Sequence, residues 1–226
     1  IYVCDVDEEA LKEYIKSLKK FSLTYFNITL NDDYEKYNVG NALAYDLSSD
    51  NPQYIPLSTY FDNLKFDIVI TNPPYKNLRA EKRYFDSEKE YLKVKEKYVS
   101  IKHSIKKHYK HIDKGTPNIY KCFVEDIVLN YTHSKSTIAL LLPRTILSDY
   151  SCYELRNNLI LNQGIKTLIN VQENDKNILA NQSITGVIIN KDRNNEIVNI
   201  YKNFQDLSDF TRININKMID TNHKNS

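Results

Sequence analysis

Glycine, cysteine and long apolar runs are scarce in this sequence, and each scarcity excludes a class of protein. The 226 residues include four glycines, no two of them close together, which excludes the glycine-rich phosphate loop and the GxGxxG dinucleotide fingerprint. The three cysteines form no CxxC pair, so we expect buried thiols in a reducing compartment rather than a zinc ribbon or a disulfide framework. The longest uninterrupted apolar run, residues 138–142, is far too short to cross a bilayer.

The composition is that of a folded globular chain. Apolar residues make up 41% of it and charged residues 27%, and a mass of 26.6 kDa is enough for one sizeable core. The chain begins Ile-Tyr-Val-Cys-Asp, without an initiating Met and without the charged start and apolar stretch of a signal peptide. We therefore expect a cytoplasmic protein with no membrane association, and a chain that is one piece of a longer polypeptide.

The charge is unevenly distributed along the chain. Residues 1–75 carry a net charge of −6, residues 76–114 carry +7 and residues 115–226 carry +1. A basic segment between acidic and near-neutral flanks predicts a local anionic partner, such as a nucleic-acid backbone. A solvated helical face is the alternative interpretation.

Three histidines in this segment, at positions 103, 108 and 111, lack carboxylate or thiolate partners at ligand spacing, and we expect no metal.

Apolar periodicity predicts strands that alternate with helices. Strands are expected at residues 1–6, 66–70, 138–142, 167–171, 184–190 and 197–201; helices are expected from an Asp7 cap to about Lys20, at 119–130, and from an Asp149 cap to about Leu161. Residues 84–111 are typical of a charged helix or a mobile insert, and residues after Lys217 of a fraying tail. The alternation predicts an α/β fold with a mostly parallel sheet and helices on both faces.

The most specific motif is Asn72-Pro73-Pro74-Tyr75, which directly follows the apolar strand at 66–70. Proline lacks the backbone donor of a strand ladder, so the strand must stop there. A Pro-Pro turn that merely caps a strand is the alternative. However, ligands bind at the carboxyl ends of strands in parallel sheets, so the placement also fits a functional site.

These residue types suit the methylation of an exocyclic amine. The nitrogen lone pair of such an amine is delocalised into its ring, which makes it a poor nucleophile. The Asn72 side-chain oxygen and the Pro73 carbonyl, held rigid by two residues of fixed φ, can each accept one amino hydrogen and favour a pyramidal nitrogen. Tyr75 offers a flat face on which a base can stack.

The motif and its surroundings resemble the adenine-N6 DNA methyltransferases of restriction-modification systems, specifically the TaqI-like group and the larger type II modification methylases with the same core. The resemblance covers most of residues 1–75 and 115–192. It implies a Rossmann-like fold that is dependent on S-adenosylmethionine, and double-stranded DNA with a flipped adenine as substrate. It also implies endonuclease and target-recognition regions in the same or a partner polypeptide.

The resemblance also implies a set of cofactor-binding residues. The segment VCDVDEEAL is similar to the family's acidic strand end, which would put Asp5 on the cofactor ribose and Val6 against its adenine. VGNALAYDL is similar to the next motif, in which Asn41, or alternatively Asp46, would meet the adenine amino group. In PNIYKCFVEDIVL, Phe123 would pack beside the same adenine. Taken alone, Asp5 could instead cap the helix that follows, Asn41 could be a turn residue, and Phe123 could be a core residue.

The sequence departs from the family pattern in three places. The family's glycine-rich cofactor loop is absent, so we expect a core that is incomplete at the N-terminus, with a gap between its first strands and the strand before Asn72. The strand at 184–190 contains no second base-stacking aromatic residue. Finally, we expect no target-recognition domain in residues 211–226, and we expect sequence specificity to be encoded elsewhere.

We therefore expect residues 1–210 to form a methyltransferase core, with a basic insert at 76–114 and a tail or the start of another segment at 211–226. The predicted reaction is N6-methylation of adenine in DNA, although the isolated fragment could be inactive. The alternatives are methylation of a protein glutamine or an RNA base, whose sp² amine suits the same acceptors, and a DNA-binding module without catalysis.

Overall fold

The computed structural model describes residues 2–5, 7–31, 36–39, 45–47, 49–56, 58–112, 118–171, 183–192 and 196–215. The chain divides into two compact units, Ile1–Leu64 and Lys65–Ser226.

The first unit contains two short parallel strands and a long helix. Its elements are β1 (Tyr2–Asp5), α1 (Glu8–Phe26), β2 (Lys36–Val39) and α2 (Ser58–Phe61), and β1 pairs with β2 in parallel. The predicted cap is confirmed, because the Asp7 side chain accepts hydrogen bonds from the backbone N–H groups of Glu9 and Ala10. The predicted helix end at Lys20 is wrong: α1 continues to Phe26, since nothing interrupts it before Asn27 adopts a left-handed conformation.

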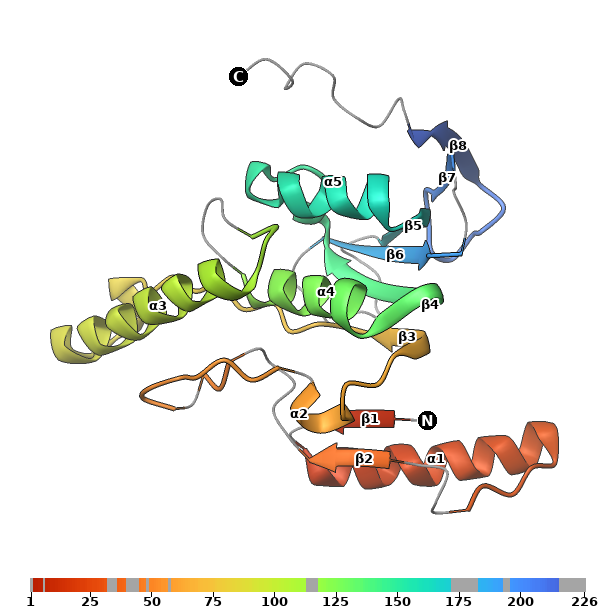
Figure 1. Cartoon of the computed structure of the whole chain (residues 1–226), viewed down its shortest axis with the longest axis horizontal. Coiled ribbons are helices and arrows are strands. Elements are labelled where there is room, and N and C mark those ends of the chain that lie inside the picture. Colours follow the sequence, from red (N-terminus) through yellow and green to blue (C-terminus); the bar gives the residue numbers. More distant parts are fainter. Residues whose placement is uncertain are drawn as a thin grey trace. The chain divides into compact units, whose positions relative to one another are not determined.

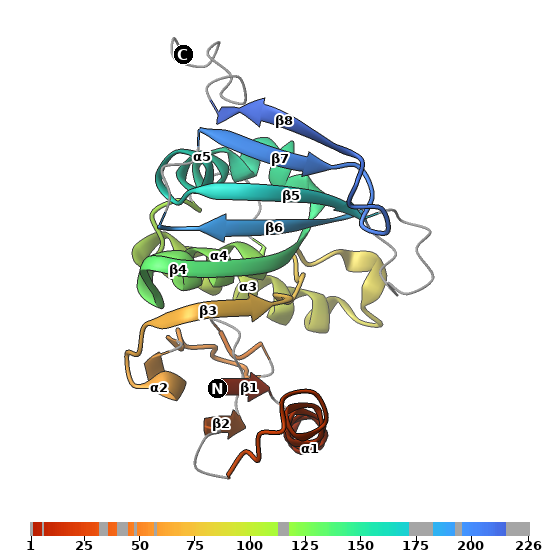
Figure 2. The ribbon, with the colours of Figure 1, turned by 90° about the vertical axis from the view of Figure 1, so that its right-hand side faces the viewer.

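The second unit is built on one six-stranded mixed sheet, shown in Figure 2. Its strands are β3 (Phe66–Thr71), β4 (Thr132–Pro143), β5 (Ile165–Val171), β6 (Ile184–Asn190), β7 (Ile197–Tyr201) and β8 (Phe210–Asn214), in the order β3-β4-β6-β5-β7-β8. Strands β3, β4, β5 and β7 run in one direction, while β6 and β8 run antiparallel to their neighbours. The expected α/β class is confirmed.

Helices α3 (Glu88–His108), α4 (Ile119–Asn130) and α5 (Tyr153–Asn162) lie together on one face of this sheet (Figure 1). Helix α4 is the most buried of them, since every residue from Ile119 to Val128 is buried. It packs against β4, whose residues Ile138, Leu140 and Leu142 are also buried. The core of the second unit therefore lies between α4 and β4.

The predicted helix start at Asp149 is wrong. Two 3-10 turns, η3 (Arg144–Leu147) and η4 (Tyr150–Cys152), separate β4 from α5, and α5 itself begins at Tyr153. Asp149 does cap a helical turn, but the turn is η4: its carboxylate accepts from the Ser151 N–H at 2.8 Å. We call residues Arg144–Cys152 the η3–η4 turn.

Strand β3 lies at one edge of the six-stranded sheet, and no other described strand pairs with its outer side. Ile68 and Ile70 of this strand are 68% and 80% exposed. In the first unit, β1 and β2 form a separate two-stranded sheet.

Candidate functional site

The Asn-Pro-Pro-Tyr motif follows β3 directly, as predicted. Strands β3 and β4 are parallel, with Thr71 opposite Leu140. The motif and the η3–η4 turn therefore both begin where the carboxyl ends of these strands lie. Asn72 is exposed, Pro73 is buried and Tyr75 is half-buried. The rigid prolines therefore anchor a loop that presents its amide side chain to solvent.

The Tyr75 hydroxyl group ties the two strand ends together. It lies 2.7 Å from the Oδ1 atom of Asn72 and 2.7 Å from the backbone carbonyl of Leu141 in β4. A phenol has one hydrogen to donate, so these two acceptors share it. Burial raises the pKa of Tyr75 to about 12, and the hydroxyl therefore keeps its proton at neutral pH.

The loop after Tyr75 is bound to the start of α4. The Ile119 N–H donates to the Lys76 carbonyl at 2.9 Å, and the Asn118 side-chain amide donates to Asn77 Oδ1 at 2.7 Å. Asn118 also caps α4, since its own Oδ1 accepts from the Tyr120 N–H at 3.2 Å. The most buried helix of the unit thus fixes the far end of the motif loop.

Two basic side chains hold the η3–η4 turn, which leaves the sheet beside the motif. The Lys121 Nζ donates to the Ser151 hydroxyl at 2.7 Å and to the Ser151 carbonyl at 3.0 Å. Arg156 Nη1 donates to the Ile146 carbonyl at 2.9 Å and to the Asp149 carbonyl at 3.1 Å. The turn is therefore cross-linked to both α4 and α5 by charge-assisted hydrogen bonds.

The predicted cofactor residues of the first unit are partly described. Asp5 ends β1 and is exposed, and its Oδ1 accepts at 3.0 Å from the N–H of Asp7, the residue that caps α1. Asp46 is half-buried. Val6 and Asn41 lie outside the described residues. A carboxylate at the end of a parallel strand, beside a helix start, has the chemistry to accept hydrogen bonds from a ribose diol, so Asp5 fits that part of the cofactor.

Phe123 lies in the second unit, one turn after Tyr120 in α4, and only 9% of it is exposed. It therefore serves mainly as a core residue, as the helical spacing allowed, and could offer a ligand no more than a small part of its ring. The sequence did not point to Tyr120, Asn118 or the Leu141 carbonyl. Tyr120 and Asn118 fall within the same segment, PNIYKCFVEDIVL, as Phe123, whereas no pattern marks one backbone carbonyl among many.

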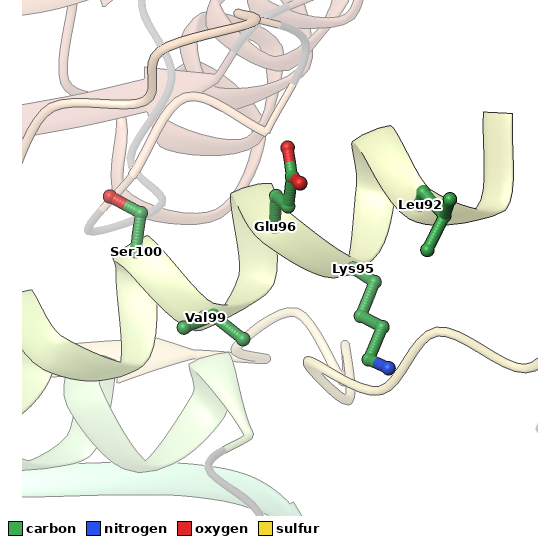
Figure 3. A pocket seen from close by; sticks show the side chains of 5 residues that line it. All are labelled: Leu92, Lys95, Glu96, Val99 and Ser100. Atoms are coloured by element: carbon green, nitrogen blue, oxygen red, sulfur yellow. The ribbon is translucent and has the colours of Figure 1, made fainter. Parts of the chain in front are cut away.

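The predicted basic insert is largely helix α3. Its buried side includes Ile101 and Ile105, whereas Leu92 and Val99, each 43% exposed, line an open hollow of about 390 Å³ with Lys95, Glu96 and Ser100 (Figure 3). The hollow is lined by this one helix and contains no residue of the Asn-Pro-Pro-Tyr motif.

Three other expectations concern metals, membranes and thiols. No group of three His, Cys, Asp or Glu side chains among the described residues is placed to hold a metal ion. None of the described helices combines the length and hydropathy needed to cross a membrane. Cys122 and Cys152 are buried free thiols, as expected, while Cys4 is half-buried.

Comparisons with solved structures show the fold. The type IIG restriction endonuclease BpuSI has a TM-score of 0.57 at 10% sequence identity, over 96% of this chain and 25% of its own. A modification subunit assigned to a type I restriction enzyme of Vibrio vulnificus YJ016 has a TM-score of 0.55 at 14% identity, over 89% of this chain and 34% of its own. The chain thus spans a quarter to a third of the length of these proteins.

Comparisons of sequence give the family. No curated protein matches the chain. The family model described as Eco57I restriction-modification methylase matches residues 1–179, which is well over half of the chain. The resemblance to the methyltransferases of restriction-modification systems is therefore confirmed at the level of the family, and this chain belongs to the Eco57I restriction-modification methylases.

Proposed function

We propose that this chain carries the catalytic centre of an S-adenosylmethionine-dependent methyltransferase that modifies the N6 amino group of adenine in DNA. The observation that carries the proposal is the Asn-Pro-Pro-Tyr loop at the end of β3. It combines an exposed amide oxygen, a buried proline and a tyrosine ring held in place by hydrogen bonds. This arrangement matches the needs of a planar amine better than those of a proton-transfer reaction.

Asn72 and Pro73 would bind the amino group that is methylated. The Asn72 Oδ1 accepts one hydrogen and the Pro73 carbonyl the other, which draws the nitrogen lone pair out of conjugation with the ring. In the free chain the Tyr75 hydroxyl lies on the same Oδ1 atom. When an amino group takes that position, the hydroxyl still has the Leu141 carbonyl at 2.7 Å, so the exchange leaves no buried donor unpaired.

Tyr75 would stack on the extruded base. Its ring is half-buried, so it offers a surface that is already partly immobilised, which lowers the entropic cost of ordering it. With its pKa raised to about 12, the phenol is a donor and not a base at neutral pH. The amine proton can leave to solvent after the methyl group has been transferred, so no general base is required before that step.

S-adenosylmethionine, when bound, supplies the electrophilic methyl group. In the first unit, Asp5 would hold the cofactor ribose, Val6 would contact its adenine, and Asn41 or Asp46 would bind the adenine amino group. Of these residues, Asp5 has the clearest support, since its carboxylate is exposed at a strand end.

Helix α3 favours DNA as the acceptor over a protein glutamine. Exposed lysines extend along it, at positions 89, 93, 95, 106 and 107. Lysines on one helix attract a polyanionic backbone and release its counterions, and a glutamine side chain has no comparable charge. Target recognition and DNA cleavage would depend on other regions of the same or a partner polypeptide.

The test is transfer of a labelled methyl group from S-adenosylmethionine to mixed-sequence duplex DNA by the full-length protein, followed by nucleoside analysis. The proposal expects label in N6-methyladenine. Asn72→Ala should reduce transfer by about 100-fold or more, the range known for loss of one preorganised polar group, and should leave cofactor affinity nearly unchanged. Asn77→Ala is the matched control, because Asn77 lies on the same loop but binds Asn118.

Three results would contradict the proposal. Label in release factor or RNA, with none in DNA, would move the function to another acceptor. A Kd for the cofactor that rises in Asn72→Ala, with kcat unchanged at saturating cofactor, would remove Asn72 from the amine site. A full-length protein that binds DNA but no cofactor would favour the module without catalysis.

A further inference from the structure

A second tyrosine, Tyr120, packs against Tyr75, the candidate base-stacking residue. The rings of Tyr75 and Tyr120 have centroids 6.2 Å apart and planes at 89° to each other, which is an edge-to-face pair. Tyr120 is 2% exposed, so it is held within the core while Tyr75 is half-buried. An edge-to-face contact covers at most one face of Tyr75.

Tyr120 is itself anchored at its far end. Its hydroxyl group lies 3.3 Å from the thiol of Cys152, a residue of the η3–η4 turn. Lys121 and Arg156 hold the same turn against α4 and α5. Tyr120 therefore connects Tyr75 to the η3–η4 turn, whose backbone is already held by hydrogen bonds from Lys121 and Arg156.

We infer that Tyr120 is a positioning residue for methyl transfer, because its ring fixes the plane of Tyr75 against which the target base stacks. The inference rests on the proposed function. In the free chain Tyr75 is held by Asn72, by the Leu141 carbonyl and by Tyr120. Once Asn72 accepts from the substrate amine, the Leu141 carbonyl and Tyr120 remain, so the contribution of Tyr120 is greatest in the bound state, where orientation determines the rate.

The test compares Tyr120→Leu with Tyr120→Phe in the full-length protein, with methyl transfer to duplex DNA as the readout. Leucine keeps apolar bulk but removes the aromatic ring, and kcat should fall about five-fold, the worth of one edge-to-face pair, while the KM values for DNA and cofactor stay within about two-fold. Phenylalanine keeps the ring and should restore kcat to near the wild-type value. Tyr109→Leu is the matched control, since Tyr109 is a buried tyrosine whose hydroxyl binds Asp126 instead of the turn.

A double variant separates positioning from general damage. If Tyr120 acts through Tyr75, then Tyr120→Leu should have no further effect on kcat in a Tyr75→Ala background. Multiplicative losses in the double variant, or equal losses in Tyr109→Leu and Tyr120→Leu, would overturn the inference. So would a wild-type kcat in folded Tyr120→Leu.

The two proposals fail in different ways. Absence of methyl transfer to DNA by the wild-type protein overturns the proposed function and the role of Tyr120 with it. Wild-type transfer that is insensitive to Tyr120 overturns only the positioning role. If Tyr120→Leu does not fold, a wild-type kcat in Tyr120→Phe together with a reduced kcat in Tyr120→Met still supports the role of the ring, whereas full activity of Tyr120→Met overturns it.

Discussion

The ring of Tyr75 should contribute to methyl transfer, whereas its hydroxyl group should contribute mainly to the stability of the fold. Tyr75→Phe keeps the ring and removes a hydroxyl that donates to Asn72 Oδ1 and to the Leu141 carbonyl. Tyr75→Ala removes both. A variant pair at one position therefore separates stacking on the base from the bond between the ends of β3 and β4.

The structure gives different magnitudes for the two changes. A half-buried hydrogen bond contributes about 1 kcal/mol to folding, so Tyr75→Phe should lower the free energy of unfolding by about that amount. It should leave methyl transfer within about three-fold of wild type, because the base retains its stacking partner and no longer competes with the phenol for Asn72. Stacking on an aromatic ring is worth about 1–3 kcal/mol per base, so Tyr75→Ala should lower kcat/KM by about 5- to 150-fold.

The assay is steady-state transfer of labelled methyl groups to duplex DNA, together with urea unfolding of each variant. Cofactor affinity, measured separately, should not change in either variant because Tyr75 is assigned to the base. The reasoning is refuted if Tyr75→Phe loses as much activity as Tyr75→Ala, since the hydroxyl would then be the working group. It is also refuted if folded Tyr75→Ala retains wild-type kcat/KM, since stacking would then be unnecessary.

Two further predictions concern the elements around the site. Charge reversal of Lys89, Lys93 and Lys106 on α3 should weaken DNA binding. It should also reduce the slope of log affinity against log salt concentration by about 0.9 for each phosphate that is no longer neutralised. An unchanged slope in a salt titration of DNA binding would remove α3 from the interface. Glu125 is 3% exposed, and its two carboxylate oxygens accept from the backbone N–H groups of Lys110 and His111, just after α3. In Glu125→Gln the side-chain NH₂ group would face one of these N–H donors, so the free energy of unfolding should fall by about 1–3 kcal/mol. The exposed Glu96→Gln should change it by less than about 0.5 kcal/mol in the same denaturation experiment.

The elements that were predicted correctly carry local signals in their own sequence. Asp7 precedes two glutamates and an apolar repeat, and β3 is a β-branched run stopped by two prolines, so local chemistry determines where each begins or ends. Strand β2 and helix α2 have four residues each and were not predicted, because so short a segment is stable only through its tertiary contacts. The same reason applies to β8, a five-residue strand that was not predicted either.

Asp149 shows how a correct local signal can lead to a wrong element. Its side chain does cap a turn, as its residue type predicts, but that turn is the 3-10 turn η4 and not the start of α5. An α-helix from Asp149 would use the Asp149 carbonyl as its first acceptor. In the structure this carbonyl accepts from the Cys152 N–H at 3.0 Å, which is the bond of a 3-10 turn, and also from Arg156 Nη1 at 3.1 Å. The local sequence therefore contains the cap but does not determine which helical form follows it.

The motif itself was predictable because its four residues are adjacent, but the groups that hold it in place come from distant parts of the chain. Tyr75 finds the Leu141 carbonyl 66 residues later in sequence, and Tyr120 reaches Tyr75 from another helix. These groups act through hydrogen bonds and ring contacts, and the Tyr75 phenol, with its pKa of about 12, holds its proton at neutral pH. Asn72 and Pro73 have no titrating group at all. A site of this kind contributes by placing neutral dipoles around an amine, so a pH dependence of methyl transfer near neutrality would have to originate in the binding of DNA or cofactor rather than in the motif.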